Sequence, residues 1–356
     1  MQHPLPRALA RWLVLFVALA LPASAVALDK EYVAAPAPKS NDDAGWYGSL
    51  RVGANLNFMH NRKVVGQLDG GQFTLGVSFD GDIGYRVGPH DWRNGLSLLE
   101  GFGYGPPINA FIKNSDTLKF DSAYFYHPEA APWVGPFARV GLLTAIFEGT
   151  DYRAAPVDYV VTNEIDAGTG APRVIAQKKR FKLSESFLPT TLKESVGVFL
   201  NPYTKEYLDI MILAGLGSHQ VFAKDQFGLA DDAATPAIEL KRLTEFVQVG
   251  FEAGLAFTGS AYAGKVKYKA YGDVLMPFYR TNREPGEKRK DYEFTNVEIG
   301  GLLSFKLVDW ASVDYILKVL RQPQLIDEWQ VQNVLLLTFS YSYAQRQIPV
   351  PAAAAK

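Results

Sequence analysis

The chain has 356 residues, and its 36 Lys and Arg residues nearly balance its 37 Asp and Glu residues. Such a balance argues against nucleic acid as a partner, because nucleic-acid-binding domains concentrate basic residues. The chain contains no cysteine, which excludes disulfide bonds, thiol catalysis and a lipid-modified N-terminal cysteine. Any attachment to a membrane therefore comes from the fold itself.

Residues 1–27 have the composition of an export signal. Arg7 and Arg11 precede the apolar stretch Trp12–Leu21, and two small–x–small cleavage motifs (ASA and AVA) follow it. The alternative is an uncleaved anchor, which the short apolar stretch disfavours because it cannot span a bilayer as a helix. Residues 28–45 are rich in Pro, Ala and polar residues, and we expect a flexible periplasmic lead-in there.

Alternating apolar and polar residues dominate the chain from 46 to 343. In the last segment every second residue from Leu335 to Tyr343 is apolar or aromatic, with Thr338 and Ser340 among the residues between. A period of two indicates a strand with two different environments. Repeated behind an export signal, this pattern predicts an all-β, antiparallel transmembrane barrel in the outer membrane of a Gram-negative bacterium. The twelve expected strands are 46–58, 72–86, 92–104, 117–126, 133–148, 190–201, 206–223, 243–258, 264–279, 293–309, 311–322 and 329–343.

The lengths of the connections orient the predicted barrel. Connections after even-numbered strands are short, and those after odd-numbered strands are long, except at 323–328. Outer-membrane barrels have short periplasmic turns, so we expect both termini in the periplasm, including a tail at 344–356. The longest connection, 149–189, contains a potential hairpin of Val157–Ile165 and Arg173–Phe181. We place this hairpin above the membrane; if it entered the wall, the barrel would have fourteen strands.

Aromatic residues mark one rim of the predicted barrel. Trp and Tyr favour the membrane–water interface because their rings are apolar while their N–H and O–H groups need partners. We expect a periplasmic girdle made of Trp46, Tyr85, Trp92, Trp133, Trp310 and Tyr343. The alternation also predicts a face in contact with outer-membrane lipid, which includes Leu50, Val52, Val249, Phe251, Ile299, Phe305 and Tyr315.

Charged residues occupy the opposite face of the same strands. A lipid-facing Lys or Arg at mid-membrane costs about 2–4 kcal/mol, so these residues are expected to line the lumen. The predicted set is Arg51, Asp80, Asp82, Arg139, Lys193, Asp209, Glu252, Lys265, Lys267, Lys269, Asp273, Glu298 and Lys306, together with Asp314 and Lys318. They form either a network of paired charges in a filled lumen or the lining of a polar pore or ligand site. Both signs are present in similar number, which gives no indication of strong ion selectivity.

No catalytic, cofactor or metal motif stands out. Of the mature histidines only His219 lies at an outer strand end, where we expect it to be solvated at the rim. A hydrolytic site there would need a Ser or Asp from another strand, since the adjacent Ser218 points to the opposite face. The pair Asp80 and Asp82 supplies too few ligands for a cation, and a lumen salt bridge is the preferred interpretation. We therefore expect a protein without enzymatic activity, cofactor or metal.

Several segments resemble a family of bacterial outer-membrane β-barrel proteins known only as a domain of unknown function. The resemblance implies a barrel and an outer-membrane location, and it transfers no catalytic residue. The tail after Tyr343 departs from the usual pattern, in which the chain stops at the final aromatic residue. The matching segments are Gly70-Gly71-Gln72, Trp92–Leu98 with Gly101 and Gly103, Lys113–Leu118, Ser184–Pro189, Ser195-Val196-Gly197, Asn201-Pro202 and Leu216–Phe222.

Three functions compete at this stage. The leading hypothesis is a porin-like small-solute channel or ligand-binding barrel, based on the inward charges and the strand number. The second is a surface scaffold with a plugged lumen, whose contact surface would be the 149–189 loop with its basic residues Lys178, Lys179 and Arg180. The third is a surface hydrolase at His219. Besides lipid, the expected partner is the barrel-assembly machinery during biogenesis.

Overall fold

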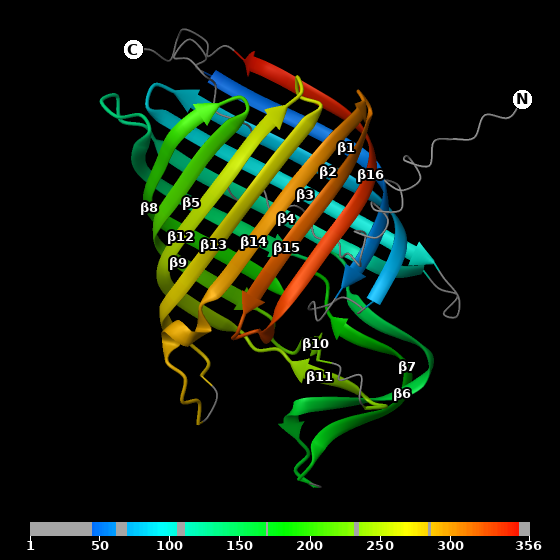
Figure 1. The fold of residues 1–356 in the computed structure, drawn as a ribbon. Helices are drawn as coiled ribbons and strands as arrows, with labels where there is room; N and C mark the ends of the chain where they lie inside the picture. The colour runs from blue at the N-terminus through cyan, green and yellow to red at the C-terminus, as the bar shows by residue number, and fades with distance from the viewer. Residues whose placement is uncertain are drawn as a thin grey trace, which may run out of the picture.

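A closed barrel joined to a small separate sheet makes up the computed structural model, which describes residues 45–61, 70–104, 111–168, 170–230, 235–283 and 286–348 (Figure 1). Twelve antiparallel strands close the barrel in the order β1-β16-β15-β14-β13-β12-β9-β8-β5-β4-β3-β2. They are β1 (Gly45–Asn61), β2 (Gly70–Val87), β3 (His90–Tyr104), β4 (Phe111–Tyr126), β5 (Val134–Thr144), β8 (Thr190–Lys205), β9 (Leu208–Phe222), β12 (Phe246–Ala261), β13 (Val266–Arg280), β14 (Asn296–Val308), β15 (Ala311–Gln322) and β16 (Ile326–Ile348).

Each of the twelve segments expected from the sequence overlaps one barrel strand, so the predicted twelve-stranded antiparallel barrel is confirmed. The fourteen-strand alternative is wrong. The largest differences are at strand ends: β4 begins at Phe111, and β16 continues past Tyr343 to Ile348. Ala344 pairs with Ser49 of β1, so the expected start of the tail at 344 falls inside the last strand. The expected export signal, 1–27, lies outside the described residues.

The two ends of the barrel differ in their connections. At one end, called the terminal end here, β1 begins, β16 ends, and the connections are short, such as Asp309-Trp310 between β14 and β15. The opposite end, the loop end, holds the longer connections, which include a 3-10 helix, η2 (Asp291–Phe294). No helix within the described ranges is long and apolar enough to cross a membrane. The alternation of short and long connections expected from the sequence is therefore present.

A second, four-stranded sheet lies beside the loop end (Figure 1). Its strands are β6 (Gly149–Ile165), β7 (Pro172–Ser184), β10 (Phe227–Leu229) and β11 (Ile238–Arg242), in the order β10-β11-β6-β7. The hairpin expected in the 149–189 connection is β6–β7, and it lies outside the barrel wall as expected. The sheet has its own apolar core, made of Tyr159, Val161, Phe181, Leu183, Leu229, Ile238 and Leu240.

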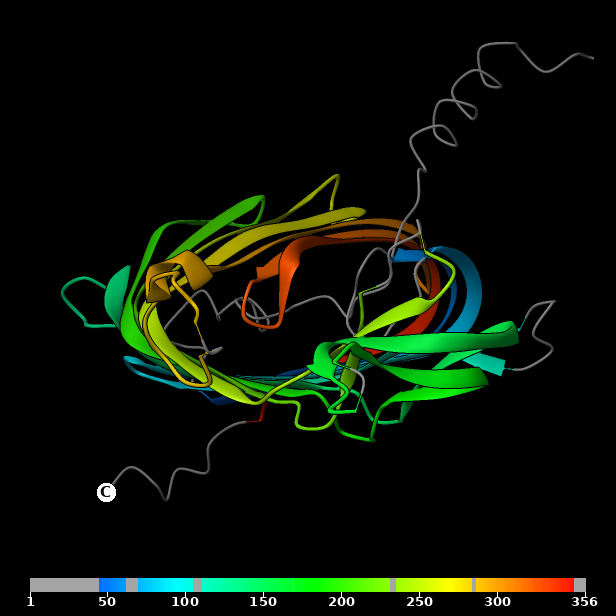
Figure 2. The same ribbon diagram turned by 90° about the horizontal axis from the view of Figure 1, so that it is seen from below.

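The barrel is flattened in cross-section (Figure 2). Within the wall, Gly197 of β8 faces Gly215 of β9. A Cβ atom on Gly215 would lie 2.1 Å from the carbonyl oxygen of Val196, so only glycine fits this close approach. The flattening brings opposite walls of the lumen within reach of each other.

The outer wall of the barrel is apolar. Every residue of the expected lipid-facing set lies on this wall, and large side chains such as Phe251, which is 57% exposed, project from it. Their strand neighbours point into the lumen, because successive side chains alternate across a sheet. The register between β1 and β2 then places Arg51 directly beside Asp80 on the inner face.

Candidate functional site

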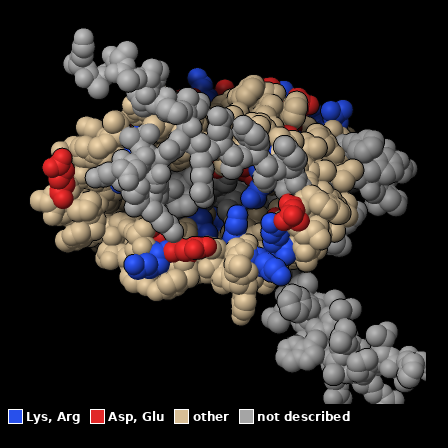
Figure 3. Space-filling view, turned by 90° about the horizontal axis from the view of Figure 1, so that it is seen from above, with Lys and Arg blue, Asp and Glu red and all other residues tan. Residues whose placement is uncertain are grey.

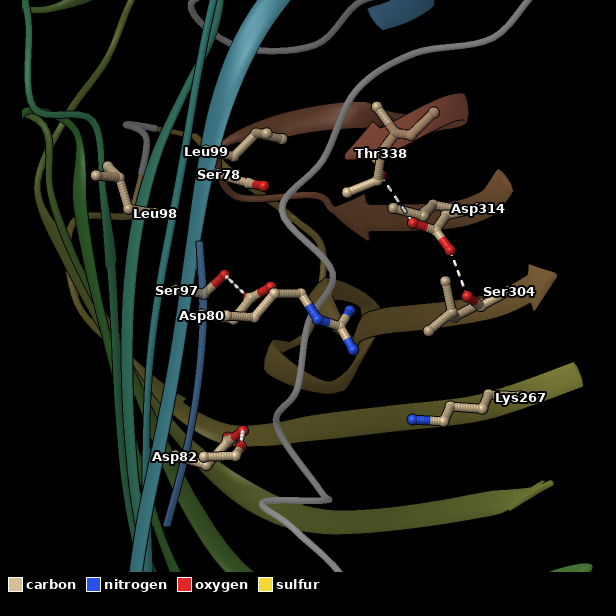
Figure 4. A pocket seen from close by; sticks show the side chains of 15 residues that line it. Ser78, Asp80, Asp82, Ser97, Leu98, Leu99, Lys267, Ser304, Asp314 and Thr338 are labelled. Atoms are coloured by element: carbon tan, nitrogen blue, oxygen red, sulfur yellow. Dashed lines mark hydrogen bonds between the residues drawn. The ribbon is translucent and has the colours of Figure 1, made fainter. Parts of the chain in front are cut away.

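The lumen contains a cavity of about 230 Å³ between two opposite walls of the barrel (Figure 4). One wall is formed by β1, β2 and β3, and the other by β13, β14, β15 and β16. The lining residues of β2 are Ser78, Asp80 and Asp82. They share the inner face of the strand because successive side chains point to opposite faces of a sheet. The lining residues are Ser49, Arg51, Ser78, Asp80, Asp82, Ser97, Leu98, Leu99, Lys267, Leu302, Ser304, Asp314, Ile316, Leu336 and Thr338.

Serine hydroxyls orient the carboxylates on the first wall. Ser97 donates to Asp80 at 2.8 Å, and Ser49 donates to Asp82 at 3.0 Å. Both serines are the direct cross-strand partners of these aspartates. The lumen salt bridge expected for this aspartate pair stays a prediction, and the register places Arg51 directly beside Asp80.

The carboxylate of Asp314 is held within the second wall. Thr338 donates to it at 2.9 Å and Ser312 at 3.0 Å, and Ser304 donates a third hydrogen bond. All three donors lie on β14, β15 or β16, next to Asp314 itself. Since an ionised carboxylate has about four acceptor positions, this carboxylate is largely satisfied by its own wall.

One side of the cavity is apolar. Leu99 of β3 forms a buried cluster with Ile316, Val334 and Leu336 from β15 and β16. These strands belong to opposite walls, so the contact crosses the flattened lumen. A cavity that combines charges, hydroxyls and an apolar surface is the usual setting for small-molecule binding.

A second group of charges fills another part of the lumen. Arg139 of β5 pairs with Glu252 and approaches Asp273 at 3.9 Å. Glu298 of β14 pairs with Lys193 of β8 at 3.0 Å and with Lys318 at 2.8 Å. The Arg139–Glu252 and Lys193–Glu298 pairs join strands that are not neighbours in the barrel order, whereas Glu298 and Lys318 lie on the neighbouring strands β14 and β15. The lumen therefore contains both arrangements considered from the sequence: paired charges in one part and a cavity in another.

Of the remaining residues that were predicted to line the lumen, some lie inside the barrel and others lie at its end, beside the turns. Asp209 accepts a hydrogen bond from Asn201 at 3.0 Å, and Lys269 lies buried with its ammonium 5.1 Å from the ring centre of Tyr271. Lys265 precedes β13 and is exposed in a turn, and Lys306 pairs with Asp309 at 2.6 Å beside the next turn. Lys265, Lys267 and Lys269 consequently do not form one ladder along the strand.

Seen from the terminal end, Lys and Arg side chains gather around the hollow of the barrel (Figure 3). The predicted aromatic girdle surrounds this same end. The ring of Trp46 lies 4.9 Å from that of Tyr85 and 6.4 Å from that of Trp92, and both tryptophans are exposed. Trp133 and Trp310 are also exposed near short connections, whereas only the backbone of Tyr343 is described, paired with Leu50.

His219 is not at a solvated rim, and that expectation is wrong. It is 3% exposed and points into the lumen, where its Nδ1 atom lies 3.0 Å from the amide nitrogen of Asn296 and its Nε2 atom 3.5 Å from that of Gln322. Its hydrogen-bond partners among the described residues are thus two amides. Neither amide is a nucleophile or an acid, so this arrangement gives no support to hydrolysis.

A turn that closes over the loop end explains the burial of this histidine. The connection between β15 and β16 folds into the barrel mouth (Figure 2), where Gln324 accepts a hydrogen bond from Gln248 at 2.9 Å. Leu325 packs in a cluster with Val221 and Phe246 of β9 and β12. The sequence showed this connection only as an unusually short one.

The barrel interior also holds polar residues that were not predicted from the sequence. Arg93 and Asp91 form a buried ion pair at 2.7 Å, to which Tyr47 donates a hydrogen bond. Lys119 of β4 is also buried, 3.3 Å from Asp121. The period-two pattern contained the signal for Arg93 and Lys119, since both alternate with outward residues on their strands.

A closed antiparallel barrel satisfies its backbone hydrogen bonds without a free edge, and its apolar outer wall suits the hydrocarbon of a bilayer. The chain is a bacterial outer-membrane β-barrel. No model of a protein family matches it, and no curated protein matches it, so its resemblance to a particular family of unknown function is not confirmed.

Comparison with solved structures finds outer-membrane proteins among those similar to this chain. An outer membrane channel from Pseudomonas putida F1 is 10% identical, with 90% of this chain and 100% of that chain covered and a TM-score of 0.38. The toluene transporter TodX of P. putida is 9% identical, with 86% and 91% covered and a TM-score of 0.34. The translocator domain of the autotransporter NalP from Neisseria meningitidis is 8% identical, with 84% and 88% covered and a TM-score of 0.35. Likeness at this level carries no conclusion about the activity of this barrel.

Proposed function

We propose that this barrel admits or binds a small solute inside its lumen, at the cavity between β1–β3 and β13–β16, without enzymatic activity. The observation that carries the proposal is the cavity of about 230 Å³, which combines charged, hydroxyl and apolar lining residues. Elsewhere the inward charges pair across the lumen, as Lys193 does with Glu298. The cavity therefore leaves room for a solute inside the lumen.

A change that fills the cavity tests this proposal. Leu336 lines the cavity, and the residue before it, Leu335, is 37% exposed on the outer wall. Leu336→Trp should reduce conductance in planar bilayers and solute entry into proteoliposomes by about tenfold, because the larger ring occupies the space of the solute. Leu335→Trp adds the same ring on the lipid side and should change neither. Absence of conductance in the unchanged protein, with no small solute shifting its thermal stability, would contradict the proposal.

The proposed orientation puts the terminal end in the periplasm and the loop end outside the cell. Short connections and the exposed girdle residues Trp46, Trp92 and Trp310 at the terminal end support this, because periplasmic turns of such barrels are short. The proposed partners are the lipid of the outer membrane, along the apolar wall, and the barrel-assembly machinery during biogenesis.

A second candidate function is surface interaction through the four-stranded sheet. Its strand β7 lies at the edge of the sheet, so part of its backbone has no strand partner, and it carries the basic residues Lys178, Lys179 and Arg180. Exposed edges can accept a strand from another chain. Replacing these three residues by Gln should abolish binding to an acidic partner, whereas Lys224→Gln at the same end should not. Retention of the cellular phenotype without the basic residues would count against this function.

A further inference from the structure

A second cavity, called the mouth cavity here, lies at the loop end between the small sheet and the barrel. Its volume is about 220 Å³. Its walls come from β6 and β11 of the small sheet, from the segment after β13 that contains η2, and from the turn between β15 and β16 (Figure 2). Gln324 and Leu325 of that turn line it. The mouth cavity shares no lining residue with the lumen cavity, so the two are separate sites.

Basic side chains predominate in the lining of the mouth cavity. They are Lys241, Arg242, Arg280, Arg283 and Arg289, and the acidic residues of the lining are Glu287 and Asp327. The arginines also form ion pairs: Arg280 and Arg283 share Asp291, Arg289 pairs with Glu287 and Asp327, and Arg242 pairs with Glu164 and Asp225. With Arg321, which also pairs with Asp327, six basic groups meet five carboxylates. Among the described residues, this cluster therefore carries a formal excess of one positive charge.

Arg280 has hydrogen-bond donors to spare at the wall of this cavity. The residue is 4% exposed, and its guanidinium carbon lies 3.6 Å from the ring centre of Phe294. Arg289 stacks on the same ring at 4.2 Å, so two guanidinium groups are held against one buried phenyl group. The Nε atom of Arg280 donates to Asp291 at 3.1 Å, and its Nη1 and Nη2 atoms make no hydrogen bond with another residue in the described ranges. Because a guanidinium has five N–H donors, those on Nη1 and Nη2 remain for a ligand.

A carboxylate matches these donors closely. Its two oxygens accept two parallel hydrogen bonds from the forked guanidinium, which adds geometric specificity to the charge attraction. The lining also includes Leu243, Pro323 and Leu325, which offer apolar surface to the rest of a ligand. A volume of about 220 Å³ corresponds to roughly seven waters at ~30 Å³ each, which is room for a solute with about seven non-hydrogen atoms.

We propose that the mouth cavity binds a small monocarboxylate with a short aliphatic chain, independently of the function proposed for the lumen. The carboxylate accepts hydrogen bonds from Nη1 and Nη2 of Arg280, and the aliphatic chain packs against Leu243 and Leu325. The single negative charge of this ligand balances the excess positive charge of the cluster. Because Leu325 belongs to the turn that closes over the mouth, the bound acid lies at the entrance to the lumen.

Three matched probes test the choice of ligand, by calorimetry on the purified full-length protein in detergent. Pentanoate carries the negative charge and the aliphatic chain, pentan-1-ol has a similar chain without a charge, and pentylamine has a similar chain with a positive charge. Pentanoate should bind at least about tenfold more tightly than the alcohol, because hydrogen bonds to charged groups are the stronger ones. Pentylamine should bind no better than the alcohol, since the cluster repels its ammonium.

Two substitutions then test the place of binding. Arg280→Lys keeps the charge next to Asp291 and removes the fork, and it should weaken pentanoate binding about tenfold. Arg180→Lys is the control, because Arg180 also pairs with a carboxylate, that of Glu148, but lies on β7 outside the lining. Thr244→Trp adds a ring at an exposed position that lines the cavity and should abolish binding, whereas Glu245→Trp, at the next exposed position outside the lining, should not weaken it.

The outcomes also separate the mouth cavity from the lumen cavity. Equal binding of pentanoate and pentan-1-ol, or no binding of pentanoate, overturns the inference. Should Arg280→Lys fail to fold, Thr244→Trp decides, and pentanoate binding that survives it overturns the inference as well. Leu336→Trp should leave pentanoate binding unchanged, and a loss of binding in that variant would place the acid in the lumen cavity, against this inference and in favour of the proposed lumen function.

Discussion

A tyrosine hydroxyl and Arg153, whose Nε lies 2.6 Å from the carboxylate, both stabilise the buried charge of Asp151 in the small sheet. Tyr159 donates a hydrogen bond of 2.8 Å to Asp151, whose side chain has no exposed surface. Hydrogen bonds to charged groups contribute about 1.5–3 kcal/mol, so Tyr159→Phe should destabilise the sheet by about that amount. Faster cleavage of β6 and β7 by a protease added to the folded barrel measures the effect. Tyr152→Phe is the control, because the hydroxyl of Tyr152 has no such bond among the described residues; equal cleavage of both variants would contradict the prediction.

The same tyrosine makes the sheet sensitive to alkaline pH. Burial, and then the bond to Asp151, raise the pKa of Tyr159 above its usual value near 10. A group with a raised pKa in the folded state contributes its stability fully below its unfolded pKa and loses it as the pH rises beyond. Protease resistance of the sheet should therefore be constant from pH 7 to about 9 and fall above about 10. Tyr159→Phe should remove this fall, and persistence of the fall in that variant would refute the assignment.

Among the elements, β8 and β9 approach each other closely at a pair of facing glycines, Gly197 and Gly215. Gly215→Ala places a Cβ atom 2.1 Å from the carbonyl oxygen of Val196, and we expect a loss of about 1–3 kcal/mol from such overpacking. The lower temperature at which the barrel unfolds on gel electrophoresis reports this loss. Gly272→Ala is a matched control in the same wall, because its Cβ would have only one neighbour, 3.9 Å away. Equal unfolding temperatures would mean that β8 and β9 move apart to accommodate the added atom.

Gln324 hydrogen-bonds the turn at the barrel mouth to β12 and to the residue after β13. Gln324 accepts from Gln248 and donates to the carbonyl of Thr281 at 2.7 Å, and Leu325 is 7% exposed beneath it. Two hydrogen bonds at about 1 kcal/mol each correspond to a change of about thirtyfold in an opening equilibrium. In a Leu325→Cys protein, Gln324→Ala should therefore speed labelling by a thiol reagent by tenfold or more. Lys288→Ala, on the exposed neighbouring loop, should not, and an unchanged rate with Gln324→Ala would show that packing alone holds the turn.

At the scale of the whole molecule, the alternation of the sequence was enough to predict the number of barrel strands and their faces. Residues such as Arg51, Asp80 and Lys267 were placed inward because a lipid-facing charge is costly. The short strands β10 and β11 were missed, since 3 and 5 residues are too few to show a period. The burial of His219 was also missed, because it depends on the turn that folds into the mouth and on the flattened section. Both are consequences of contacts between walls, which no single strand pattern contains.

Orientation in the membrane is a property of the whole molecule that can be measured directly. Tyr262, in the turn after β12, is 80% exposed at the terminal end, and Ile165, at the end of β6, is 65% exposed at the loop end. The native chain has no cysteine, so Tyr262→Cys and Ile165→Cys each offer one reactive thiol. In intact cells, a thiol reagent that cannot cross the membrane should label position 165 and leave position 262 unlabelled. After the outer membrane is permeabilised, both positions should react, which shows that the second thiol was shielded by the membrane and not by the fold. Labelling of 262 alone in intact cells would reverse the proposed orientation, and the basic edge of β7 would then face the periplasm and have no access to a partner outside the cell.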